Sequence, residues 1–350
     1  FQNAFFSFLD SQYWVTEYDE GNDVAANEFL KKIEKYPSAN LKKLIVQACI
    51  QELFELMYAA NTEEMSLWYG QGQRGDTDYT DSLLLTGFSP IVEELANPIK
   101  GKIKKQSVVT DIKYKKKPVI AYEDRSTGTI KKKKITADKV IVTVPLGVLK
   151  ADGINFQPKL SKSTKKLINN IGMGKMIKMF MFWKEGKKYT FWDNTHDMFF
   201  DSNTVGSDFR LTFYNPSYSH GKQLPYLFTF MSGPAPMALE KAYGKSNPKK
   251  YEEEMTKLVM RSLRNIFGDD IPDPRKVVLT DWDVDEFSYG VYSFNKVGYK
   301  EGNRKKLREP IKNKLYFGGE HVSSNYYGSV QGAYWSGITA AEKVAISMKA

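Results

Sequence analysis

The segment Leu315–Ala341, LYFGGEHVSSNYYGSVQGAYWSGITAA, constrains the fold of this chain more than any other. It opens with Leu315-Tyr316-Phe317, a run of apolar β formers too short for a helix, which predicts a buried strand. Gly318-Gly319 lets the backbone turn, and Glu320 follows at the carboxyl end of the strand, where open α/β sheets place ligands. A helix of small residues is predicted from Gly332 to about Met348, and its first turn can donate backbone N–H groups to an electron-rich ligand.

Spacing alone also fits a strand, loop and helix packed only for stability, with Gly332 and Gly337 permitting close helix contacts. The residue types at these positions, however, resemble the C-terminal FAD-binding signature of the flavin amine oxidases, which include polyamine oxidases, monoamine oxidases and histone demethylases. In that family a strand is followed by (Ala/Gly)-Gly-Glu, a loop, and a helix that begins Gly-x-Val-(His/Gln)-Gly-Ala. The resemblance implies FAD as cofactor, with Gly319 and Glu320 at its ribityl region and the backbone of Ser329-Val330 facing the pyrimidine edge of the flavin.

Three further segments resemble motifs of the same family. Val109-Thr110-Asp111-Ile112 resembles the V-x-x-I segment whose backbone contacts the adenine, which implies a cofactor contact at Val109. The run Ala137–Leu149, ADKVIVTVPLGVL, matches a second family segment. Around Phe287–Ser293 the resemblance places Trp282 and Phe287 near the cofactor, and Phe287 and Tyr292 in the substrate pocket. From the pattern alone, these aromatic residues predict only an aromatic-rich pair of strands.

A lysine interrupts the apolar face of one predicted strand. The segment Met176–Trp183 alternates so that Lys178 shares a face with Met176, Phe180 and Phe182. A lysine in such a position usually lies at a sheet edge, with its ammonium group reaching water. The run that starts at Gly172 resembles the family's G-x-G-x-x-x-K strand, whose lysine holds a water against flavin N5, and the resemblance therefore implies a catalytic role for Lys178.

The family also has an N-terminal βαβ unit, which carries G-x-G-x-x-G for the pyrophosphate and an acidic residue for the ribose. Neither is predicted here, because no stretch has that glycine spacing after a predicted strand, and the chain is expected to lack its main phosphate-binding segment. Trp68 to Asp81 is predicted to be a polar, glycine-containing loop. The chain begins at Phe1, so we expect it to be processed or to be part of a longer polypeptide. Three explanations stay open: the unit is on a second chain, it is left out of this sequence, or it was lost in a non-catalytic relative.

The resemblance implies the fold class α/β plus α+β, with a three-layer FAD-binding domain, incomplete in this chain, and a substrate domain built on a mixed sheet. Residues 86–150 and 276–350 are predicted for the FAD-binding domain, and residues 1–85 and 151–275 for the substrate domain. Periodicity predicts helices at Val24–Tyr36, Asn40–Ala60, Ser161–Ile171 and Lys250–Phe267, and one that begins with Ser89 as N-cap and Pro90 in its first position. Strands are predicted at Ser82–Thr86, Val108–Tyr114, Val119–Asp124, Thr129–Thr136, Lys139–Val144, Phe209–Tyr214, Tyr226–Met231 and Val277–Asp283.

Charge and composition exclude several kinds of function. Much of the net charge of +10 lies in basic runs, which usually mark solvated loops and hairpin ends, and no nucleic-acid-binding motif accompanies them. The single cysteine, Cys49, excludes an intramolecular disulfide and a Cys-cluster metal site, and the three histidines are too scattered for any metal site. With no apolar run long enough to span a bilayer, no signal peptide and no N-glycosylation sequon, we expect an intracellular protein, in the cytoplasm or in an organelle such as the mitochondrion. The basic runs are Lys102–Lys105, Lys113–Lys117, Lys131–Lys134 and Arg304-Lys305-Lys306.

The predicted function is the FAD-dependent oxidation of a small-molecule amine, with polyamines ahead of other amines, giving aldehyde and amine products and hydrogen peroxide. Polyamine oxidases are the most similar members in the GSVQGAY and PLGVL segments, although Ser329 stands where many members have an aromatic residue. A monoamine, an amino acid or a methylated lysine stays open as the substrate. The alternative is a catalytically inactive structural or assembly subunit built on the oxidase fold, which the lysine-rich surface and the missing glycine motif favour.

Overall fold

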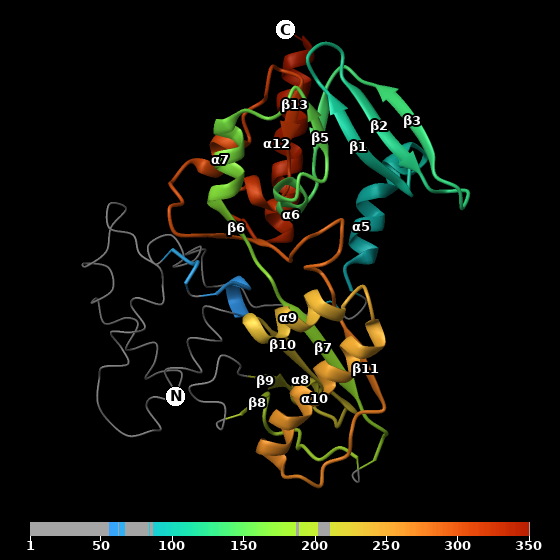
Figure 1. Cartoon of the computed structure of the whole chain (residues 1–350), viewed down its shortest axis with the longest axis vertical. Coiled ribbons are helices and arrows are strands. Elements are labelled where there is room, and N and C mark those ends of the chain that lie inside the picture. Colours follow the sequence, from blue (N-terminus) through green and yellow to red (C-terminus); the bar gives the residue numbers. More distant parts are fainter. Residues whose placement is uncertain are drawn as a thin grey trace, which may run out of the picture.

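The computed structural model describes residues 56–61, 63–66, 84, 87–186, 189–201 and 211–349. These residues form two bodies, one above the other in Figure 1. The predicted helix Val24–Tyr36 and Cys49 lie outside the described residues, as do all but the last turn of Asn40–Ala60 and all of Ser82–Thr86 except Leu84. In the described part of the chain, no helix combines the length and the apolar character needed to cross a membrane.

The upper body contains a four-stranded sheet with the order β3-β2-β1-β5. Strands β1 (Ser107–Lys113), β2 (Val119–Asp124) and β3 (Lys131–Thr136) form an antiparallel meander, and β5 (Asn155–Gln157) runs parallel to β1. The meander predicted from the alternation of apolar residues and lysines is therefore confirmed. Every residue of the edge strand β3 is exposed, and its lysines discourage pairing with another chain.

The predicted buried strand of the C-terminal segment is confirmed as β13 (Leu315–Phe317), whose side chains are at most 1% exposed. It pairs in parallel with β4 (Val140–Val142). Both runs are apolar without alternation because a parallel pair is covered on both faces. Helix α12 (Val330–Lys349) packs beside β13 and begins two residues before the predicted start.

Short helices complete the core of the upper body. They are α6 (Leu146–Lys150), α7 (Lys162–Asn170), α11 (Asn303–Leu307) and the 3-10 turn η4 (Glu320–Val322). Ser161 caps α7 as its N-cap residue, because its hydroxyl accepts a hydrogen bond from the Thr164 N–H at 3.1 Å. The core joins Ile112, Phe156 and Phe317, and the last two rings meet edge to face.

The lower body is built on a five-stranded sheet with the order β11-β7-β10-β9-β8. Every pair of neighbours that the structure describes in it is antiparallel, so only the antiparallel part of the predicted mixed sheet is present there. Methionine and leucine side chains on one face pack against helix α10, which runs over Pro248–Phe267 from its N-cap Asn247. The strands and the remaining helices are β7 (Ile177–Phe182), β8 (Met198–Phe200), β9 (Thr212–Tyr214), β10 (Tyr226–Met231), β11 (Lys276–Leu279), α8 (Pro216–His220) and α9 (Pro234–Tyr243).

A two-stranded antiparallel ribbon of β6 (Ile171–Met173) and β12 (Ser293–Asn295) lies where the chain passes between the bodies. Two separate hydrophobic cores flank this point, since Ile171 belongs to the upper core and Ile177 to the lower one. Ile154, Phe156 and Ile168 also pack into the upper core. The predicted domain boundary at residues 150 and 151 stays a prediction.

Two of the predicted boundaries that differ from the structure change where a residue lies relative to its helix or strand. Strand β11 ends at Leu279, so Trp282 lies in a turn after the strand instead of near its end. Helix α5 (Ser89–Ala96) has Phe88 in the N-cap position with no side-chain capping bond, and Ser89 is already its first residue. The 3-10 helix η2 (Asn97–Lys102) continues it. No residue of α5 is buried, so this helix has an apolar side without a partner among the described residues.

Candidate functional site

The Glu320 carboxylate lies at the end of β13, as predicted, and the protein's own donors hold it firmly. Its Oε1 accepts a hydrogen bond from the Ser293 N–H at 3.1 Å. Its Oε2 accepts one from the Ser293 hydroxyl at 2.6 Å and one from the Gly328 N–H at 2.5 Å. Gly319 precedes it with φ +130°, a backbone conformation that favours glycine. The side chain is therefore oriented by groups on both β12 and the loop before α12.

Helix α12 begins at Val330, ten residues after Glu320. The Ser329 hydroxyl accepts a hydrogen bond from the Gly332 N–H at 3.1 Å, which is the bond of an N-cap residue, and donates to the Tyr326 carbonyl at 2.7 Å. A Cβ on Gly332 would lie 1.9 Å from the Tyr326 carbonyl oxygen, so only glycine fits at that position. Val330 is 55% exposed, and the start of the helix is thus open to a ligand.

Backbone hydrogen bonds bring the predicted aromatic residues to the start of β7. The Gly290 N–H donates to the Trp282 carbonyl at 2.9 Å, and the Gly174 N–H donates to the Tyr292 carbonyl at 2.7 Å. The Tyr292 hydroxyl donates to the carbonyl oxygens of Leu56 and Met57, and burial raises its pKa to about 12. Since Ser293 directly follows Tyr292 and bonds Glu320, this loop connects the β7 region with the Glu320 region.

Lys178 lies on the half-buried face of β7, as the alternation predicts. Its backbone N–H donates to the Thr280 hydroxyl at 2.8 Å. Thr280 lies two residues before Trp282 in the sequence, so this bond places Lys178 near the Trp282 turn. Its ammonium group lies 4.9 Å from the centre of the Phe230 ring. The same face carries stacked rings from three strands, Phe180, Phe228 and Tyr214. Lys178 is therefore a cation on an aromatic surface, and it lies on a strand that is paired on both sides.

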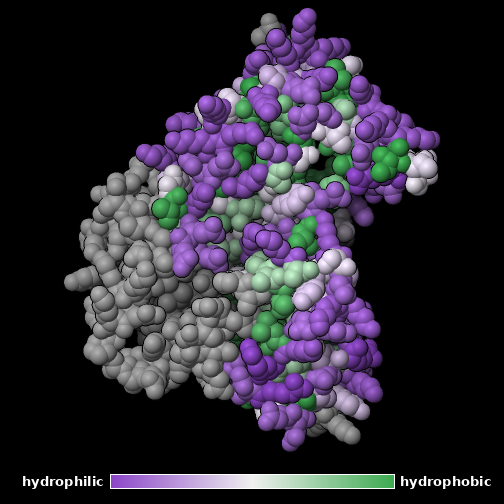
Figure 2. All heavy atoms as spheres, in the orientation of Figure 1, coloured by the Kyte–Doolittle hydropathy of each residue, from purple (hydrophilic) through white to green (hydrophobic). Residues whose placement is uncertain are grey.

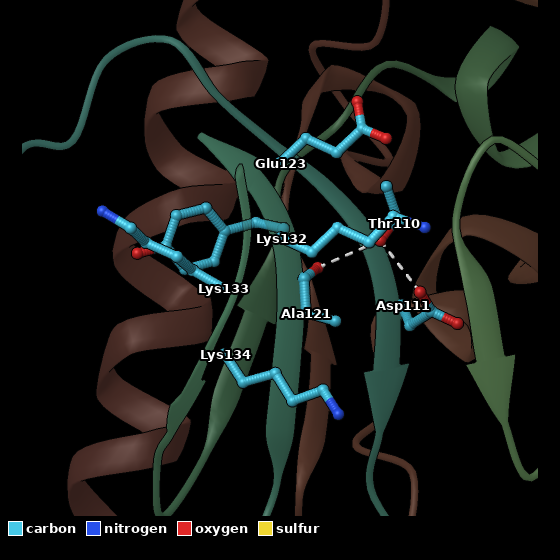
Figure 3. A pocket seen from close by; sticks show the side chains of 8 residues that line it. Thr110, Asp111, Ala121, Glu123, Lys132, Lys133 and Lys134 are labelled. Carbon is cyan, nitrogen blue, oxygen red and sulfur yellow. Dashed lines mark hydrogen bonds between the residues drawn. The ribbon is translucent and has the colours of Figure 1, made fainter. Parts of the chain in front are cut away.

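Val109 is half-buried in β1 and packs against the upper core. It takes no part in the described hydrogen bonds that connect Glu320, Tyr292 and Trp282. Beside it, a shallow cavity of about 480 Å³ opens on the sheet β1–β2–β3. Figure 3 shows the Thr110 hydroxyl at this cavity, bonded to the Asp111 carboxylate at 2.8 Å and directed at the Ala121 carbonyl. The hydrogen bond from Asn155 lowers the pKa of Asp111, and Glu123 lies opposite Lys132, so the cavity is lined by both acidic and basic groups.

Arg304 was assigned with Lys305 and Lys306 to a solvated basic run, and for Arg304 that prediction is wrong. Its side chain is 0% exposed because α11 turns it inward, where it bonds Ser293 and Asn295. The basic run alone does not show which of its three residues faces the core. Helical spacing is the signal that identifies Arg304, because it shares a helix face with Leu307, which is buried one turn further along.

Two other buried groups near the site were not predicted. Burial lowers the pKa of His321 to about 4, and its Nε2 has no hydrogen-bond partner among the described residues. Burial and the neighbouring Asp283 raise the pKa of Glu240 to about 7. Its side chain comes from α9 and accepts a hydrogen bond from the Asp283 N–H, next to Trp282. Among the described residues, no three or more His, Cys, Asp or Glu side chains are arranged to hold a metal ion.

Comparison with known proteins places this geometry in a family. The profile of a family described as flavin containing amine oxidoreductase matches residues 8–345. Polyamine oxidase 4 of Oryza sativa subsp. japonica is 28% identical over 349 residues, which cover 98% of this chain and 65% of that protein. Lysine-specific histone demethylase 1 homolog 3 of Arabidopsis thaliana is 30% identical over 297 residues, 82% of this chain and 17% of that protein. The chain thus spans less than two thirds of the length of either relative.

Solved structures show the same fold. Wild-type putrescine oxidase bound to putrescine superposes with a TM-score of 0.68 at 18% identity, over 95% of this chain and 70% of that one. Cyclohexylamine oxidase from Brevibacterium oxydans IH-35A gives a TM-score of 0.64 at 18% identity, over 99% of this chain and 74% of that one. At these identities the likeness carries the fold and leaves the substrate open.

Proposed function

The chain belongs to the flavin-containing amine oxidoreductases, whose cofactor is FAD, and from this we propose that it oxidises an amine at the site around Glu320, Lys178 and the start of α12. The observation that carries the proposal is the hydrogen-bonded connection between these parts. One loop, from Trp282 to Ser293, bonds both Gly174 before β7 and Glu320 after β13.

The residues present suit the ribityl and ring portions of FAD. The Glu320 carboxylate is an oriented acceptor for hydroxyl groups, and the exposed first turn of α12 offers N–H donors to an electron-rich ring edge. Trp282 is 47% exposed and Phe287 50% exposed, which leaves aromatic surface for a flat ligand. A Cβ on Gly319 would meet the His321 ring, and a Cβ on Gly332 would meet the Tyr326 carbonyl, so both glycines permit the close packing of the loop beside Glu320.

The phosphate-binding part of the site is proposed to lie outside the described residues. The spacing G-x-G-x-x-G does occur once, as Gly70–Gly75 (GQGQRG), within the predicted loop and outside the described residues. The alternative is a βαβ segment on a longer or a second polypeptide. The apolar side of α5 supports the proposal that a further segment packs there in the complete site. Phe88, Val92 and Leu95 on this side are each more than 50% exposed. Figure 2 shows apolar side chains exposed between the two bodies, against a largely hydrophilic upper surface.

The bound flavin supplies the two-electron oxidation of the carbon–nitrogen bond of the amine. We assign to Lys178 the binding of a water molecule beside the reacting groups, because its ammonium group is half-buried on the aromatic face of β7. Tyr292 and Phe287 are proposed to line the amine pocket. With water and O2 as co-substrates, an amine R-CH2-NHR' then gives an aldehyde, the amine H2NR' and hydrogen peroxide.

Polyamines are the proposed substrates ahead of other amines. The support is the match to a polyamine oxidase over nearly the whole chain, together with aromatic rings that attract an alkylammonium group. A monoamine or a methylated lysine would use the same rings.

The test is a flavin absorbance spectrum of the purified protein, followed by peroxide release with spermidine, benzylamine and a dimethyl-lysine peptide. We expect bound flavin and the highest rate with spermidine. Glu320→Ala should lose flavin, whereas the control Glu309→Ala, an exposed acid paired with Lys343, should keep it. A protein that folds without binding added FAD would instead support the inactive structural subunit.

A further inference from the structure

Arg304 is a fully buried cation that the proposed chemistry does not use. It projects from α11 at 0% exposure, whereas its neighbours Lys305 and Lys306 are exposed. Burial lowers the pKa of its guanidinium group, and the charge of Glu320 opposes that shift. A buried charge of this kind is strongly unfavourable unless hydrogen bonds and a counter-charge compensate it. The surroundings of Arg304 therefore show what holds it in place.

Protein groups satisfy the guanidinium. Nη1 donates to the Ser293 hydroxyl at 2.7 Å and to the His321 carbonyl at 2.9 Å, and Nε and Nη2 share the Asn295 side-chain oxygen at 3.3 and 2.9 Å. The Tyr299 side chain bonds it as well, and the Tyr327 ring lies 4.1 Å from its central carbon. With five N–H donors and these acceptors, Arg304 has no donor left for a phosphate group.

These bonds have only one possible direction. A guanidinium group donates and never accepts, so the Ser293 hydroxyl must accept from Arg304. The single proton of that hydroxyl is then free only for Glu320 Oε2, at 2.6 Å. Oε2 also accepts from the Gly328 N–H, and Oε1 accepts from the Ser293 N–H. Of about four acceptor positions on a carboxylate, the described residues fill three and leave one open, on Oε1.

We propose that Arg304 is a positioning residue, which acts through Ser293 to leave Glu320 a single open acceptor position on Oε1. That position suits one hydroxyl group of the ribityl chain, and it disfavours phosphate, which brings only acceptor oxygens and negative charge. The inference rests on the proposed function, because it assigns the hydroxyl to FAD. It adds that the specificity of Glu320 depends on a residue that touches neither Glu320 nor the ligand directly.

The test is a double-mutant cycle on FAD affinity, measured by quenching of flavin fluorescence when FAD is added to flavin-free full-length protein. Ser293→Ala removes the relaying hydroxyl and keeps the backbone N–H. Arg304→Gln removes the cation, and Arg304→Lys keeps the charge if Arg304→Gln does not fold. Each single variant should weaken FAD binding about ten- to hundredfold, the range for a hydrogen bond to a charged group. The double variant should bind FAD no more weakly than whichever single variant has the lower FAD affinity, because both changes break the same relay.

The matched control is Lys305→Gln, which makes the same change of charge on the exposed side of α11 and should leave FAD affinity unchanged. Multiplicative losses in the double variant, or equal effects of Arg304→Gln and Lys305→Gln, would overturn the relay. If the wild-type protein binds no FAD, the proposed function fails, and the relay is then tested by unfolding alone. Coupled shifts in Tm for Ser293→Ala and Arg304→Gln would support it, and additive shifts would refute it.

Discussion

Glu240→Gln should stabilise the protein at alkaline pH and leave its stability nearly unchanged at acid pH. The Glu240 side chain is 1% exposed, and one of its oxygens, Oε2, has no hydrogen-bond partner among the described residues. Asp283 and Asp281 lie near it and disfavour its charge, and Lys175, which pairs with Asp283 at 2.9 Å, offsets only part of that effect. Gln keeps the shape and the acceptor for the Asp283 N–H but cannot ionise.

The magnitude follows from the pKa of Glu240, which burial, and then Asp283, raises from 4.5 to about 7. The folded protein keeps a proton that the unfolded chain releases between these two values, so stability from this group falls as the pH rises through that window. At about 1.4 kcal/mol for each unit of pKa, the full loss is about 3 kcal/mol above pH 7. Glu240→Gln removes the loss, so the variant should exceed wild type by about 2–3 kcal/mol at pH 8 and by little at pH 5.

The assay is urea unfolding of both proteins at pH 5 and pH 8, followed by tryptophan fluorescence. The control is Glu252→Gln, an exposed acid on α10, which should shift stability equally little at both pH values. A difference between Glu240→Gln and wild type that is the same at pH 5 and pH 8 would refute the reasoning. It would mean that Glu240 is charged in the folded protein and that Lys175, or a partner outside the described residues, compensates it.

Lys178→Met should leave the free energy of unfolding equal or higher, because an apolar side chain replaces a half-buried ammonium group. It should also slow anaerobic flavin reduction or reoxidation by O2, and unchanged rates in stopped flow would rule out the catalytic role of Lys178. Gly332→Ala should destabilise the protein by about 1–3 kcal/mol, because the added methyl group meets the Tyr326 carbonyl, whereas Gly337→Ala, with open space around it, should be neutral or stabilising in thermal unfolding. Phe317→Ala should cost about 3–5 kcal/mol in denaturant unfolding, because the ring is 1% exposed and packs edge to face on Phe156; a loss below 1 kcal/mol would contradict the described core.

Local patterns predicted the elements whose geometry depends on near neighbours in sequence. The apolar run Leu315–Phe317 could only be a buried strand, and the alternation around Lys178 placed it on the face with Phe180 and Phe182. Gly332 was expected to permit a close contact, and it does, whereas Gly337 has open space. These successes share one cause, because backbone geometry repeats every two or 3.6 residues and the side-chain pattern follows it directly.

The sequence by itself determined the family signature, the buried strand Leu315–Phe317, the lysine-bearing meander and the face of β7 that carries Lys178, because these depend on residue order alone. Tertiary structure alone decided that Arg304 leaves its basic run to become buried, that Glu240 on α9 approaches Asp283 in the turn after β11, and that Trp282 lies in a turn bound to Gly290. Each of these depends on contacts with residues beyond the same helix or strand, where burial and neighbouring charge set the protonation and position of a group. No periodicity records such contacts, because the chain must first fold to bring the partners together.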